Sequence, residues 1–90
     1  MNFSEHDEDA RADRFFADAI GAIEQQLASD ETPYVAREYG RLTAAGMSDE
    51  EAKEAMARCL IEEMDRVLRT KSGFDEAGYR MSLERIMPEG

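Results

Sequence analysis

Apolar residues recur every three or four positions along four stretches of the chain, and this spacing predicts four amphipathic helices. The predicted helices cover residues near 5–28, 33–45, 49–71 and 76–86. No window shows the alternation of apolar and polar residues that is typical of a strand. Because short connections favour antiparallel neighbours, the sequence predicts an all-α fold, a small antiparallel bundle of about four helices, two long and two short.

The clearest signal for a helix start lies in residues 46–51. Gly46 suits the left-handed residue that follows a helix end. Ser48 suits the N-cap, where its hydroxyl can accept a hydrogen bond from the first turn. Glu51 lies three residues later and can reach back to the Ser48 N–H, so the pair predicts a capping box at the start of the third helix.

The fourth predicted helix begins with a similar signal. Asp75 suits its N-cap, and Phe74, just before the cap, can pack against Tyr79 as a hydrophobic staple. Pro88 ends the pattern close to the end of the sequence.

The predicted core follows from the apolar stripes of these helices. It comprises Phe16, Ile20, Ile23, Leu27, Val35, Leu42, Met56, Cys59, Leu60, Met64, Val67, Leu83 and Ile86.

The 90 residues are predicted to form a single helical domain, in which residues 1–8 are open to fraying because the opening turn, Glu5 to Asp9, is densely acidic. The formal net charge is −10, from 21 acidic against 11 basic residues. Such a surface repels phosphate backbones and anionic lipid headgroups, so the sequence predicts no nucleic-acid partner and no membrane binding. The N-terminal residues lack the basic and apolar regions of a signal peptide, and one cysteine cannot form an internal disulfide, so the expected location is cytoplasmic.

The sequence offers few residues for catalysis or for a cofactor. Cys59 lies within an apolar stripe without a basic neighbour, which favours a core residue over a reactive thiolate. There is one histidine, and neither a phosphate-binding glycine loop nor a CxxC pair is present. These observations favour a protein that is not an enzyme and that carries no cofactor.

Three groups of acidic residues are candidates for a divalent metal site. His6 and Asp9 share a face of the first helix, and Glu50 and Glu54 lie one turn apart on the third. Glu24 on the first helix could join them. The structural interpretations are solvated helix starts for the first two groups and, for Glu24, a polar contact with a basic residue such as Arg41.

Two stretches resemble an uncharacterised family of small bacterial helical domains. Residues 24–28 and 32–36 are similar to an E-N-Q-L-A … P-P-E-V pattern, and residues 41–42 and 46–56 to R-L … G-x-[DS]-R-H-E-A-I-H-A-I. The resemblance covers roughly residues 20–86 and implies a helical fold without a known activity. The two histidines of the family pattern correspond to Glu50 and Glu54 here, so a metal role carried by those histidines does not transfer to this chain.

Two functions from different classes follow. The preferred hypothesis is a non-catalytic helical interaction module that binds another protein or a second copy of itself through the faces of its long helices. The alternative is a carboxylate-based domain that binds a divalent metal or hydrolyses a substrate, which requires at least three carboxylates to converge in one pocket.

Overall fold

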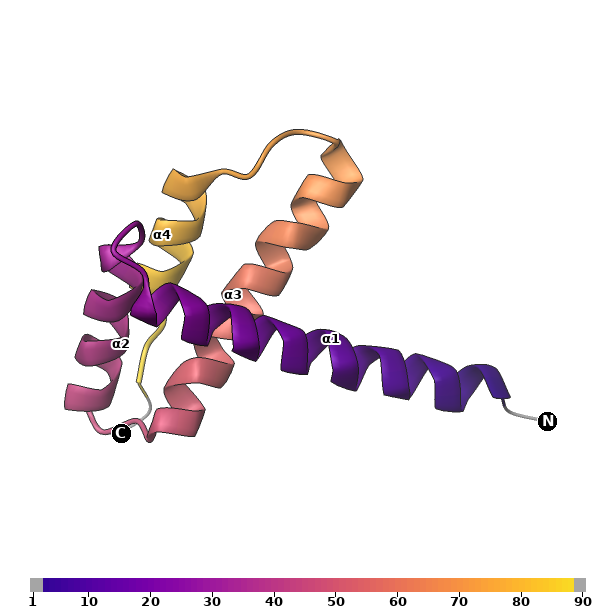
Figure 1. Cartoon of the computed structure of the whole chain (residues 1–90), viewed down its shortest axis with the longest axis horizontal. Helices are drawn as coiled ribbons and strands as arrows, with labels where there is room; N and C mark the ends of the chain where they lie inside the picture. Colours follow the sequence, from indigo (N-terminus) through magenta and orange to yellow (C-terminus); the bar gives the residue numbers. More distant parts are fainter. Residues whose placement is uncertain (1–2, 89–90) are drawn as a thin grey trace.

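The computed structural model describes residues 3–88, with side chains from residue 14 onward, as a bundle of four α-helices. The helices are α1 (Phe3–Ala28), α2 (Pro33–Ala44), α3 (Asp49–Thr70) and α4 (Glu76–Glu84). Helices α2, α3 and α4 alternate in direction, and α1 lies across them, with its N-terminal half extending past the others (Figure 1). The all-α prediction is confirmed, and residues 3–88 contain no strand.

The helix boundaries follow from the capping residues. The Ser48 hydroxyl accepts from the Glu51 N–H at 3.1 Å, and the Glu51 carboxylate accepts from the Ser48 N–H at 2.9 Å, so the predicted capping box is confirmed. The turn between α2 and α3 needs a residue with positive φ, and Gly46 supplies it with a φ of 109°. The Asp75 carboxylate caps α4 by accepting from the Gly78 N–H at 3.1 Å.

Four boundaries differ slightly from the prediction, and helix α2 ends at Ala44 instead of residue 45. Helix α1 begins at Phe3 instead of residue 5, and α4 ends at Glu84 instead of residue 86. Helix α3 ends at Thr70 because Lys71, and not a glycine, adopts the left-handed conformation that closes it.

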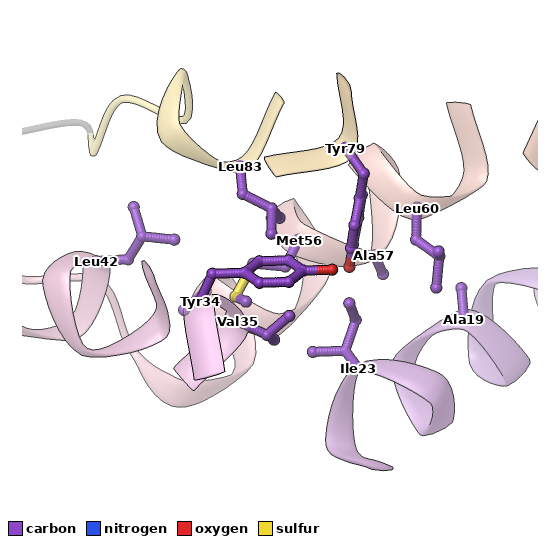
Figure 2. Packing of buried hydrophobic residues seen from close by; sticks show 11 residues of the cluster. Ala19, Ile23, Tyr34, Val35, Leu42, Met56, Ala57, Leu60, Tyr79 and Leu83 are labelled. Atoms are coloured by element: carbon purple, nitrogen blue, oxygen red, sulfur yellow. The ribbon is translucent and has the colours of Figure 1, made fainter. Parts of the chain in front are cut away.

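The core lies where α1 crosses α3, with α2 packing against both of these helices and α4 packing against α2 and α3 (Figures 1 and 2). Figure 2 shows Leu60 of α3 next to Ala19 of α1, with Ile23 close by. Alanines at such a crossing let two helix backbones approach closely. The buried apolar residues are Ala19, Ile23, Tyr34, Val35, Leu42, Ala52, Met56, Ala57, Leu60, Tyr79 and Leu83.

The predicted core is wrong at one position, too inclusive at others, and lacks the buried residues Ala19, Tyr34, Ala52, Ala57 and Tyr79. Met64 is exposed, although it lies on the same stripe as Leu60. The reason is geometric, since α1 crosses α3 instead of following it, so α3 loses its neighbour beyond the crossing. The predicted residues that are only partly buried are Phe16, Ile20, Leu27, Cys59, Val67 and Ile86.

A buried carboxylate joins α3 to the connection that follows it. Glu63 accepts two hydrogen bonds from the Arg66 guanidinium, at 2.8 and 2.6 Å, and one from the Asp75 N–H at 2.7 Å. Arg66 also donates to the Gly73 carbonyl at 2.9 Å. These contacts fix the connection so that α4 turns back onto the core.

Stability at acidic pH should depend on Glu63. The hydrogen bonds from Arg66, and then the one from the Asp75 N–H, lower the pKa of Glu63 from 4.5 to about 2. A carboxyl with a lowered pKa stabilises the fold above its unfolded pKa, and this contribution is lost as pH falls through the folded value. Glu63→Gln should therefore lower the thermal midpoint near neutral pH and lose less stability than the wild type between pH 4.5 and about 2.

Thermal melts across this pH range, with Glu62→Gln as control, test the prediction. Glu62 is the exposed neighbour of Glu63 on α3. If Glu62→Gln and Glu63→Gln have the same acid dependence, Glu63 is not the group responsible.

Candidate binding surfaces

The first candidate surface is a groove between α1 and α3, beside the point where they cross. It encloses about 520 Å³. Its apolar floor is formed from α1, by Phe16, Ala17 and Ile20. Its polar wall consists of Glu24, Asp49, Glu50, Lys53 and Glu54. We call these eight residues the α1–α3 groove.

The wall of the α1–α3 groove carries four carboxylates against one ammonium group. Lys53 lies between two of the carboxylates, 3.3 Å from a Glu24 oxygen and 3.2 Å from an Asp49 oxygen. Glu54 is 3.9 Å from Arg58, and Glu50 has no basic partner among the side chains of residues 14–88. The groove therefore combines an apolar floor with a net negative wall.

The ionised state of this wall is reinforced by its own contacts. The hydrogen bond from the Tyr39 hydroxyl, and then the one from Lys53, lower the pKa of Asp49. Hydrogen bonds to Asp49 and then Glu24 raise the pKa of Lys53. At neutral pH, Lys53 and Asp49 are therefore charged and hold one another in place.

The structure brings three of the predicted metal candidates, Glu24, Glu50 and Glu54, to the same groove. However, no three His, Cys, Asp or Glu side chains of the described residues are arranged so that they could hold a metal ion. The Lys53 ammonium lies between Glu24 and Asp49, where a bound cation would have to lie to bridge them. Glu24 makes the predicted polar contact with a basic residue, but that residue is Lys53. Arg41, named as an example, instead donates to Glu38 on its own helix, at 2.7 Å.

Three further residues were named as candidates or weighed for reactivity in the sequence: His6, Asp9 and Cys59. The side chains of His6 and Asp9 lie outside the described residues. Cys59 is half-buried, and burial raises the pKa of its thiol to about 11, so it stays protonated at neutral pH and is a poor nucleophile.

No match was found when the chain was compared with protein-family models, with curated proteins and with solved structures. The resemblance to a family of bacterial helical domains stays a prediction. Among the described helices, none is both long enough and apolar enough to cross a lipid bilayer.

The second candidate surface lies where the N-terminal half of α1 and the C-terminal half of α3 diverge (Figure 1). Phe15, Met64 and Leu68 are 42%, 39% and 72% exposed, and we call these three residues the apolar edge. Phe15 and Met64 line a shallow hollow of about 150 Å³, and Leu68 follows Met64 by one helical turn.

Sequence reasoning missed the role of Lys53 and the exposure of the apolar edge. Lys53 could have been identified, because it follows Asp49 by four residues in the order that favours an ion pair on a helix. The exposure of Met64 could not have been predicted, because its position on the helix is equivalent to that of Leu60. Only the direction of α1 decides which of the two is covered.

Proposed function

We propose that this protein is a non-catalytic helical interaction module that associates with a second copy of itself through the apolar edge. The observation that supports this proposal is the exposure of Phe15, Met64 and Leu68 together at one place. Single exposed apolar residues are common on protein surfaces, but an adjacent group of large ones is typical of an interaction site.

The shape of the apolar edge suits a two-fold arrangement. Leu68 is exposed one helical turn after Met64, which lines the hollow together with Phe15. In a two-fold dimer, each contact occurs twice, so Leu68 of each copy can enter the hollow of the other.

The net charge of the chain predicts how this self-association should depend on salt. Two copies that each carry −10 repel one another, and salt screens this repulsion over about 10 Å at 0.1 M ionic strength. Self-association through apolar side chains should therefore become stronger as the salt concentration rises.

Substituting Leu68 by lysine tests the proposal. Leu68→Lys should shift the protein to monomer in size-exclusion chromatography with light scattering, because a charged group would be buried in an apolar contact. Met87→Lys is the matched control, since Met87 is 81% exposed and lies outside the apolar edge. Both substitutions change the net charge equally, so a difference between them reports on the contact.

Two results would contradict the proposal. One is a wild-type protein that stays monomeric at all concentrations and salt levels. The other is a dimer that Met87→Lys disrupts as much as Leu68→Lys does, which would place the interface elsewhere.

A further inference from the structure

The α1–α3 groove lies near the crossing of the two helices and is lined by residues that the apolar edge does not include. We infer that this groove binds a basic amphipathic helix of a partner protein, which places an apolar side chain on Phe16 and Ile20 and lysine or arginine side chains against Glu50 and Glu54. This inference goes beyond the proposed self-association, because it concerns another surface and another partner.

The apolar floor of the groove can pack against an apolar side chain of the partner. Phe16 and Ile20 are only partly buried, although they lie on the core stripe of α1, and Ala17 beside them is exposed. A volume of about 520 Å³ lies within the range of about 300–1,000 Å³ that ligand pockets have. An apolar group entering this space would cover the exposed parts of Phe16 and Ile20.

The negative charge of the wall favours a partner segment that is positively charged. Lys53 pairs with Glu24 and Asp49 and so offsets part of the negative charge. Among the side chains of residues 14–88, Glu50 has no basic partner, and the only basic group near Glu54 is Arg58, at 3.9 Å. An acidic segment, a nucleic acid or an anionic lipid surface would be repelled by these groups and by the charge of −10 on the whole chain. A basic segment would be attracted by both.

The secondary structure of the groove favours a helical partner. An extended peptide gains its main-chain hydrogen bonds from a free sheet edge, and residues 3–88 offer none. A helix satisfies its own backbone groups and binds through side chains spaced three or four residues apart. The apolar side chains of α1 lie beside the acidic side chains of α3, and this arrangement suits a helix with one apolar and one basic face.

A designed peptide tests this inference on the intact protein. The probe is a helix of about 18 residues of leucine and lysine with the leucines on one face, long enough to be helical in water. At about 0.15 M salt, it should shift the amide resonances of Ala17, Ile20 and Lys53 in a heteronuclear NMR titration, whereas those of Met64 and Leu68 should stay in place. Binding should weaken as salt rises, opposite to the salt dependence expected for self-association.

A pair of variants identifies the surface. Ala17→Lys adds a positive charge and a long side chain inside the groove, and it should weaken peptide binding at least about tenfold. Ala36→Lys adds the same group at an exposed position of α2 and should leave binding within about twofold. Both positions are exposed on helices, so circular dichroism should show that both variants keep the fold.

Several outcomes would overturn the inference. A peptide of the same composition with its leucines spread around the helix should bind much more weakly, and equal binding would mean that the apolar floor plays no part. Spermidine should not displace the peptide at equal charge concentration, and full displacement would mean that the wall attracts any cation. Equal binding by Ala17→Lys and the wild type would also exclude the groove.

Because Leu68→Lys leaves the groove intact, that variant should bind the peptide like the wild type even if self-association is absent.

Discussion

Leu60→Ala is expected to reduce the free energy of unfolding by about 2–5 kcal/mol, because it removes a buried leucine and leaves a cavity at the crossing of α1 and α3. Leu60 is only 5% exposed and lies next to Ala19 of α1 (Figure 2). Since a domain of this size is stable by only about 5–15 kcal/mol, this one substitution removes a large share of the total. Denaturant titration followed by circular dichroism measures the change.

The control for Leu60→Ala is the same substitution two turns later on the same helix. Leu68 is exposed, so Leu68→Ala should change the stability of the monomer by no more than about 0.5 kcal/mol. A loss of less than about 1 kcal/mol for Leu60→Ala would show that Leu60 is not central to the core, and with it that α1 does not cross α3 there.

Tyr79→Ala should cost about 3–5 kcal/mol, as is usual for removal of a large buried aromatic side chain. Tyr79 of α4 is fully buried and packs edge-to-face against Tyr34 of α2 and Phe74, with ring centroids 6.2 and 5.5 Å away. Its hydroxyl donates to the Gln26 side chain of α1 at 2.7 Å. One side chain thus connects α4 to two other helices, and chemical denaturation of the variant measures its contribution.

Tyr79→Phe separates the ring from the hydroxyl. It keeps the aromatic packing and removes only the hydrogen bond to Gln26, so it should cost about 1 kcal/mol. If Tyr79→Phe destabilised the protein as much as Tyr79→Ala, the hydrogen bond and not the aromatic cluster would hold α4 in place.

Local signals in the sequence were sufficient to predict the four helices and the side-chain caps of α3 and α4. The Ser48 and Glu51 capping box, the Asp75 cap and the contact between Phe74 and Tyr79 all depend on residues close together in the chain. Such interactions form whatever the distant helices do, so sequence patterns alone predict them.

The direction of α1 across the bundle could not be predicted in the same way. Periodicity shows which face of a helix is apolar. It does not show how far along that face a neighbouring helix packs. Leu60 and Met64 are equivalent by periodicity, yet one is buried and the other exposed. For the same reason, Glu24, Glu50 and Glu54 could be named as candidates, whereas the groove that they share with Phe16 and Ile20 depends on the crossing.

The most direct test of the proposed self-association is a search for contacts between two copies. In a mixture of isotope-labelled and unlabelled protein, filtered nuclear Overhauser spectra detect only contacts between different molecules. We predict such contacts between the Leu68 methyl groups of one copy and the Phe15 ring of the other. A spectrum with no intermolecular contact at concentrations where light scattering detects dimer, or with contacts only at other surfaces, would contradict the assignment of the apolar edge as the interface.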